Sequence, residues 1–110
     1  MTKDNFLYID HLLDSIEKIE KYVENLTIHD FVENELVQDT VIRNFEIIGE
    51  ATKRLSKDFR SENTEIPWKK IAGMRDILIH DYLGIDIYSV WNAIEQNLPD
   101  LKRQLIQIKR

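Results

Sequence analysis

Residues 5–26 read NFLYIDHLLDSIEKIEKYVENL, and this stretch decides the class of fold. Apolar side chains recur in it at alternating intervals of four and three residues, the spacing of one face of an α-helix. Asp4 or Thr2 stands in front of the stretch, and both are residue types that cap helix N-termini. The pattern predicts an amphipathic helix with one buried side. Its apolar face consists of Leu12, Ile16, Ile19, Val23 and Leu26.

Helical spacing continues after this stretch. Residues 27–31 read as a turn that enters a short helix, and a long helix is predicted over residues 34–59. A loop is predicted over residues 60–66, after which Pro67 suits the first position of the next helix, where no N–H donor is needed. The apolar face of the long helix consists of Val37, Val41, Phe45 and Ile48.

The helix that follows Pro67 should end near Leu83, with Gly84 as its C-terminal cap. A last segment begins behind Asp86 and carries an apolar stripe, inside which Pro99 predicts a kink or break. The chain has only 3 Gly and 2 Pro, so little interrupts the helical pattern. We therefore predict an all-α, up-and-down bundle of four to five helices. The last stripe consists of Ile87, Val90, Ile94, Leu98, Leu101, Leu105 and Ile108.

Length and composition limit the number of domains and the classes of protein to which the chain can belong. With 110 residues the chain suits a single domain, residues 1–110, and it has no Cys for disulfides or thiolate metal sites. No apolar run approaches the roughly 18 residues of a membrane-spanning helix. The polar N-terminus lacks the apolar core of a signal peptide. A cytoplasmic protein without a membrane partner is expected.

Charge is distributed unevenly along the chain. Residues 1–50 carry 4 basic and 12 acidic side chains, whereas residues 51–75 carry 7 basic and 3 acidic ones. The basic excess suits a local phosphate-binding face, although a solvated helix end and loop would show the same charges. The acidic remainder should weaken non-specific binding to long nucleic acids.

Directly after the basic segment, residues 74–82 read MRDILIHDY and place Arg75, His80 and Tyr82 in the pattern Arg-x4-His-x-Tyr. A guanidinium can hold a phosphate in a forked contact. An imidazole is the usual protein acid or base near neutral pH. Because the ribose 2′-OH supplies a nucleophile, these two groups suffice in principle to cleave RNA without a metal.

Helix geometry separates the two groups. On a straight helix Arg75 and His80 lie about 140° apart, whereas Arg75 and Tyr82 lie about 20° apart, and Asp76 shares a face with His80. Arg75 and His80 therefore converge only if the helix distorts or ends near His80, or if a second copy of the chain completes the cleft.

Simpler interpretations exist for each residue of interest. His80 could be a surface or cap histidine, Arg75 a partner in a helix-surface ion pair, and Tyr82 a half-buried aromatic residue. Trp68 and Trp91 could stack on bases but are more often core or interface residues.

Glu46 and Glu50 are spaced i, i+4 and could bind a metal. Without a nearby histidine, a solvated or partner-facing edge is the simpler interpretation. His11 and His29 stand in no motif, and both are interpreted as ordinary histidines.

Several stretches together resemble a known family. The motif itself, VIRNFEIIGEA at residues 41–51, IPWKKIAGM at residues 66–74 and the pair Val90-Trp91 are similar to the HEPN superfamily. More narrowly, they resemble the HepT branch, the toxin of MNT–HepT toxin–antitoxin systems. The resemblance covers nearly the whole chain.

The resemblance implies a metal-independent endoribonuclease toxin that needs no cofactor and acts as a homodimer with facing motifs. Arg75 and His80 would be catalytic, with Asp76 in support. Asparagine is common at the position of Asp76 in the family, and an aspartate adds negative charge near the phosphate.

The resemblance also implies regulation. Tyr82 would support the site and accept AMP from a cognate MNT-type nucleotidyltransferase antitoxin. Independently of the resemblance, the basic charge directly before the motif makes Lys69, Lys70 and Arg75 candidates for binding the RNA phosphates. Two alternatives remain open: a non-catalytic subunit that binds nucleotides or partners, and a purely structural oligomerisation domain.

Overall fold

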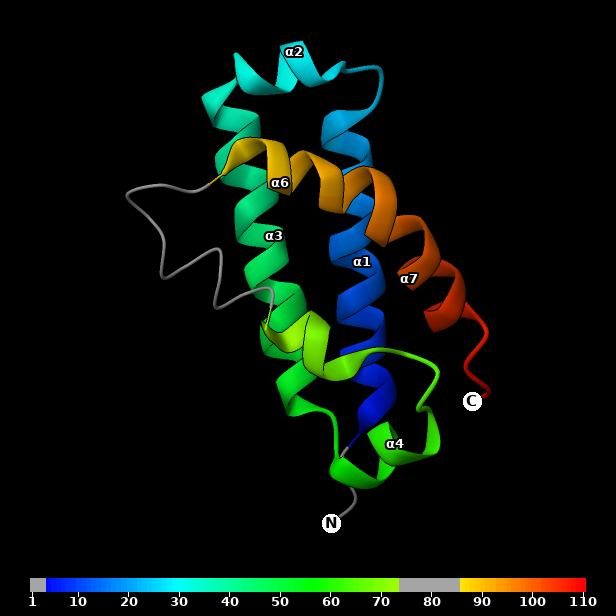
Figure 1. Cartoon of the computed structure of the whole chain (residues 1–110). Coiled ribbons are helices and arrows are strands. Elements are labelled where there is room, and N and C mark those ends of the chain that lie inside the picture. Colours follow the sequence, from blue (N-terminus) through cyan, green and yellow to red (C-terminus); the bar gives the residue numbers. More distant parts are fainter. Residues whose placement is uncertain (1–3, 74–85) are drawn as a thin grey trace.

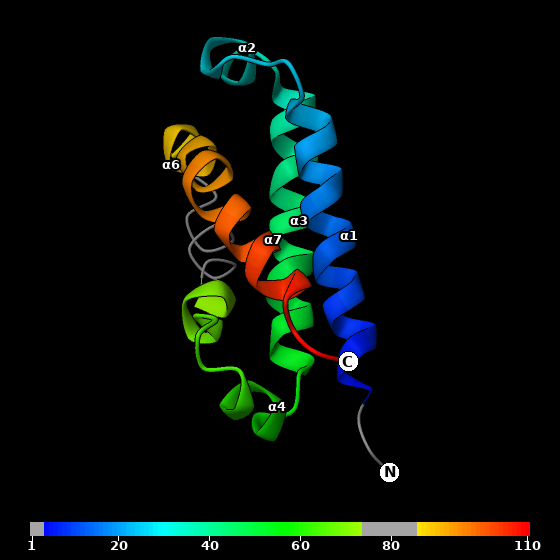
Figure 2. The same cartoon turned by 90° about the vertical axis from the view of Figure 1, so that its right-hand side faces the viewer.

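The computed structural model describes residues 4–73 and 86–110, and throughout these ranges the regular structure is helical. Helix α1 pairs with α3, and this pair forms one layer (Figure 1). The 68–73 helix and the C-terminal helices α6 and α7 cross one face of the pair as a second layer (Figure 2). The helices are α1 (Asn5–Val23), α2 (Ile28–Val32), α3 (Glu35–Arg54), α4 (Lys57–Glu62), residues 68–73, α6 (Ile87–Asn92), the π-helical segment η1 (Ala93–Asn97) and α7 (Leu98–Ile106).

The core lies between these two layers. The predicted apolar stripes face it, because Leu12, Ile16 and Ile19 of α1 are fully buried against α3 and the C-terminal helices. Covering one face of the pair in this way is the usual solution for amphipathic helices. The prediction of an all-α fold is confirmed. The other buried residues of the stripes are Val41, Phe45, Ile48, Val90, Ile94, Leu98, Leu101 and Leu105.

Capping side chains fix the starts of α1 and α2. The Asp4 carboxylate accepts a hydrogen bond from the Leu7 N–H at 3.2 Å and begins α1. Helix α1 ends at Val23, three residues before the predicted end, because Asn25 adopts a left-handed φ of 65°. Asn tolerates this conformation better than most residues. The predicted short helix after this turn is α2, and Thr27 caps it.

The prediction of one helix over residues 34–59 is wrong at its C-terminal end. Helix α3 ends at Arg54, Leu55 is extended, and Ser56 caps the separate helix α4, which reaches into the predicted loop. Asn5 explains the break: its side chain donates to Ser56 Oγ at 3.2 Å and accepts from the Ser56 N–H at 2.8 Å. The break also allows Leu55 and Phe59 to be buried together.

The predicted kink near Pro99 takes the form of η1, directly before the proline. Proline lacks an N–H donor, and its ring collides with the carbonyl group four residues earlier, so a widened turn relieves both problems. The chain changes direction between α6 and α7 (Figure 1). An ion pair between Lys102 and Glu20, 2.9 Å apart, then ties α7 to α1.

Candidate functional site

The motif residues Arg75, Asp76, His80 and Tyr82 lie outside the described residues, as do Leu83 and Gly84, at the predicted helix end. The structure instead describes the two segments that lead into and out of the motif. Their geometry shows how firmly the fold holds both ends of this part of the chain.

The lead-in segment is anchored by Trp68. Its side chain is 7% exposed, and its indole Nε1–H donates to the Asn63 carbonyl oxygen at 3.0 Å. The Trp68 ring packs against Phe59, with 6.3 Å between ring centroids. Ile66 and Ile71 on either side are also buried. The 68–73 helix is therefore fixed to the core directly before the motif.

The segment after the motif begins with a helix cap. The Asp86 carboxylate accepts hydrogen bonds from the Ser89 hydroxyl at 2.8 Å, and from the Tyr88 and Ser89 N–H groups at 3.0 and 3.3 Å. The hydrogen bond from the Ser89 side chain, with those from the two backbone donors, lowers the pKa of Asp86. Asp86 caps α6, as its position in the sequence predicts.

Lys69 and Lys70 are exposed on the lead-in helix and line a shallow hollow together with Arg60 of α4. We call this depression, with a volume of about 620 Å³, the basic hollow. Its floor includes Ile66 and Pro67. Among the described residues, Arg60 Nε is buried and has no hydrogen-bond partner. Three cations around one open depression suit the phosphates of a nucleic acid strand.

The rest of the basic segment does not gather at this hollow. Arg54, at the end of α3, lines a different depression between α1 and α3. Lys53 and Lys57 are exposed elsewhere on α3 and α4 and do not line the hollow. The basic excess of residues 51–75 is thus divided between at least two surfaces.

The two tryptophans have packing roles. Trp68 is buried, and the half-buried Trp91 packs against Phe31, with 5.2 Å between ring centroids. Base stacking on an open tryptophan face is therefore not a feature of the described surface. The interpretation of both as core residues is the one that the structure supports.

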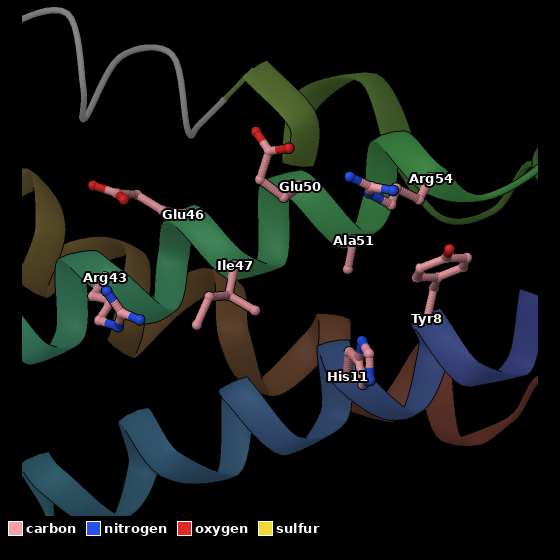
Figure 3. Close-up of a pocket in the computed structure, with 8 residues that line it drawn as sticks. All are labelled: Tyr8, His11, Arg43, Glu46, Ile47, Glu50, Ala51 and Arg54. Carbon is pink, nitrogen blue, oxygen red and sulfur yellow. The ribbon is translucent and has the colours of Figure 1, made fainter.

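A groove of about 380 Å³ runs between α1 and α3, with His11 on one side and Glu46 and Glu50 on the other (Figure 3). Figure 3 shows the two carboxylates pointing away from His11. No group of three potential metal ligands occurs among residues 4–73 and 86–110. Glu46 is half-buried and Glu50 is exposed where they line this groove.

Arg60 is the residue of the basic hollow that the sequence analysis did not single out. It lies nine residues before Lys69, and nothing in its local pattern distinguishes it from Lys57. Only the turn at residues 63–66, which folds the lead-in helix back on α4, brings the three cations together.

None of the described helices combines the length and hydrophobicity that a bilayer-spanning segment requires.

Comparison with known proteins gives consistent matches. The sequence model of a family described as ribonuclease HepT-like matches residues 12–108. A Thermococcus cleftensis protein named a probable ribonuclease HepT is 37% identical over 94% of this chain and 94% of its own length. A Caldanaerobacter subterraneus protein provisionally named an RNase is 40% identical over 92% of this chain and 90% of its own length.

A longer relative shows that the domain also occurs beside another one. A Methanocaldococcus jannaschii protein, named a gamma-glutamylcyclotransferase and provisionally an RNase, is 45% identical over 98% of this chain. The match spans 49% of that protein's length. No solved structure gives a significant match to the chain.

Proposed function

Because this chain belongs to the HepT-like ribonuclease family, we propose that it is a metal-independent endoribonuclease and the toxin of a toxin–antitoxin pair. The observation that carries the proposal is the basic hollow, which the fold builds from Arg60, Lys69 and Lys70 directly before the Arg-x4-His-x-Tyr motif. Lys69 and Lys70 of the hollow stand five and six residues before Arg75 in the sequence, so phosphates bound there would lie on the segment that leads into the motif.

In the proposed reaction the ribose 2′-oxygen forms a bond to the adjacent phosphorus while the bond from phosphorus to the 5′-oxygen breaks. One proton leaves the 2′-OH and another reaches the departing 5′-oxygen. His80 is proposed to transfer protons, and Arg75 to hold and stabilise the charged phosphate. Asp76, four residues before His80 in the sequence, is proposed to support the site.

We propose further that the active form is a homodimer in which two motifs share one cleft. The support is the angle of about 140° between Arg75 and His80 on a straight helix, which a second copy of the chain would compensate. A two-fold axis beside the motif would place Arg75 of one protomer near His80 of its partner.

Regulation is proposed to act on Tyr82. A cognate nucleotidyltransferase would transfer AMP from ATP to the phenolic oxygen and release pyrophosphate. The added phosphate carries negative charge next to Arg75 and the cations of the basic hollow. It would occupy the place of the RNA phosphate and block cleavage.

The test measures cleavage of total RNA by the purified protein and by His80→Ala and Arg75→Ala. Each substitution is expected to lower the rate by about a hundredfold or more, since a general acid–base group contributes about 10²–10⁴-fold. His29→Ala, a histidine on α2 outside the motif, is the matched control and should cleave normally. EDTA should not change the rate. Near-normal cleavage by His80→Ala contradicts the mechanism, and loss of cleavage on chelation contradicts metal independence.

The regulatory proposal has a separate readout. Incubation with a cognate nucleotidyltransferase and ATP should add one AMP per chain by intact-mass measurement and stop cleavage. Tyr82→Phe should fold, gain no mass and escape inhibition. A full yield of AMP on Tyr82→Phe would place the modification at another residue.

A further inference from the structure

A second depression lies on the other side of the lead-in helix, between α3, the 68–73 helix, η1 and the start of α7. We call it the amide pocket, after the side chains at its mouth. Its volume is about 280 Å³, just below the roughly 300–1,000 Å³ typical of ligand pockets. A depression of this size can take one flat ring system.

Apolar side chains form the walls of the amide pocket. Phe45, Ile48 and Leu98 are each 2% exposed, and Leu101 is 8% exposed. They belong to α3 and α7, so the walls are part of the rigid core. Such walls offer an unpaired base the apolar contact that it loses when it leaves a stack.

Two amide side chains that line the pocket make no hydrogen bond within the described part of the chain. Neither Gln96 nor Asn97 makes a side-chain hydrogen bond among residues 4–73 and 86–110, and Asn97 lies where η1 passes into α7. Gln104, also in the lining, is engaged: its Nε2 donates to the Glu65 carbonyl oxygen at 3.1 Å. An amide presents a donor and an acceptor side by side, the pattern that recognises a base edge.

The backbone that carries these amides is unusual. Gln96 and Asn97 are the last two residues of η1, the π-helical segment. Single π-helical turns are frequent at functional sites, and they turn side chains away from the positions of a regular α-helix. Pro99 accounts for the widened turn, and the widened turn carries both amides to the mouth of the pocket.

The amide pocket adjoins the basic hollow. Lys70 and Pro67 line both depressions, so they form a shared rim. Lys70 is exposed and can reach a phosphate at this rim. A nucleotide whose phosphate lies in the hollow would therefore have its base next to the pocket.

Charge narrows the choice of base. The carboxylates of Glu65 and Asp100 line the pocket, although Arg103 pairs with Asp100 at 2.8 Å. Carboxylates accept hydrogen bonds and do not donate them when ionised, so they favour base edges with amino groups. Adenine, cytosine and guanine carry an exocyclic amino group with two N–H donors, whereas the base edge of uracil has a single N–H donor, at N3.

We propose that the amide pocket binds one unpaired base of the RNA substrate and selects bases with an exocyclic amino group. The proposal rests on the proposed ribonuclease function and adds a specificity site to it. Gln96 and Asn97 read the edge of the base, the apolar walls hold its ring, and Lys70 holds the neighbouring phosphate.

The experiment compares the protein with the double variant Gln96→Leu/Asn97→Leu. The matched control, Asn92→Leu/Gln107→Leu, makes the same two chemical changes at exposed positions that do not line the pocket. A library of random RNA is cleaved by each protein, and the ends are sequenced to give the base preference at each position around the cut. Circular dichroism verifies that all three proteins are folded.

The wild-type protein and the control should share a preference against uracil at one position near the cut. The pocket variant should lose this preference, with cleavage of preferred sites lowered by about 5- to 150-fold, the range of one bidentate amide–base contact. An unchanged preference in the pocket variant overturns the proposal. So does the absence of any preference against uracil in the wild type.

A binding measurement separates this proposal from the proposed function. If the wild type cleaves no RNA, its affinity for labelled eight-nucleotide oligomers of adenosine, cytidine and uridine is measured by fluorescence anisotropy. This tests the base pocket without any cleavage. Tighter binding of the first two, lost in the pocket variant and kept in the control, supports the base pocket while the ribonuclease proposal fails. Equal binding of all three oligomers overturns the pocket as well.

Discussion

Replacing Lys69 and Lys70 together by glutamine removes two exposed cations from the basic hollow. Glutamine keeps helix propensity close to that of lysine, so the lead-in helix should persist. Each phosphate contact to a single strand contributes about 0.7 to the slope of log binding constant against log salt concentration. Two lost contacts should therefore lower the slope by about 1.4. When salt is raised from about 50 to about 200 mM, both proteins lose affinity for RNA. The factor by which the variant loses affinity should be about seven times smaller than the factor for the parent protein.

The assay is fluorescence anisotropy with a labelled uridine oligonucleotide, titrated at several salt concentrations. All proteins carry His80→Ala, so that the RNA stays intact during the measurement. A uridine-only probe isolates the phosphate contacts, because the amide pocket is proposed to disfavour uracil.

The control is Lys18→Gln/Lys21→Gln, which makes the same change of net charge on α1, where both lysines are exposed. It should keep the parent slope. If the two double variants have equal slopes, the phosphates do not contact the basic hollow, and the reasoning that places RNA there is refuted.

Three further predictions concern stability. Trp68→Phe should lower the free energy of unfolding by about 1–3 kcal/mol in urea titrations, since it removes a buried hydrogen bond and leaves a void, whereas Trp91→Phe should cost clearly less. Ile16→Ala should cost about 2–5 kcal/mol and Leu36→Ala, at 76% exposure, less than about 0.5 kcal/mol; equal losses would contradict the assigned core. Because hydrogen bonds lower the pKa of Asp86 below 3.8, the ionised cap stabilises above that pH and its contribution is lost as pH falls through the lowered value. Melting temperatures of Asp86→Ala and the parent should differ at pH 6 and converge in acid, and a constant difference would contradict the role of the charge.

Much of the fold could be predicted because helices are local structures. The recurrence of apolar residues in residues 5–26 identifies both α1 and the face that it buries. The caps Asp4, Thr27 and Asp86 act on N–H groups two or three residues away, so they too can be predicted from adjacent residues. Pro99 likewise predicts a distortion of the helix that contains it.

The candidate site could be predicted only in part. Lys69 and Lys70 were singled out from their position before the motif, and the structure places both in one hollow. Whether Arg75 and His80 converge depends on residues 74–85, outside the described ranges, and stays a prediction. The division of the basic segment between two surfaces was not predicted, because the sum of charges over a stretch carries no direction.

The sequence by itself determined the helical class, the buried faces and most helix starts, since each follows from contacts within about one or two turns of the chain. Tertiary structure alone decided three features. Asn5 bonds to Ser56, 51 residues away, and so ends α3 before α4. Arg60 joins the two lysines across a turn, and the amides of η1 meet a wall supplied by α3. These features require segments distant in sequence to pack together, and no local pattern encodes which surfaces will meet.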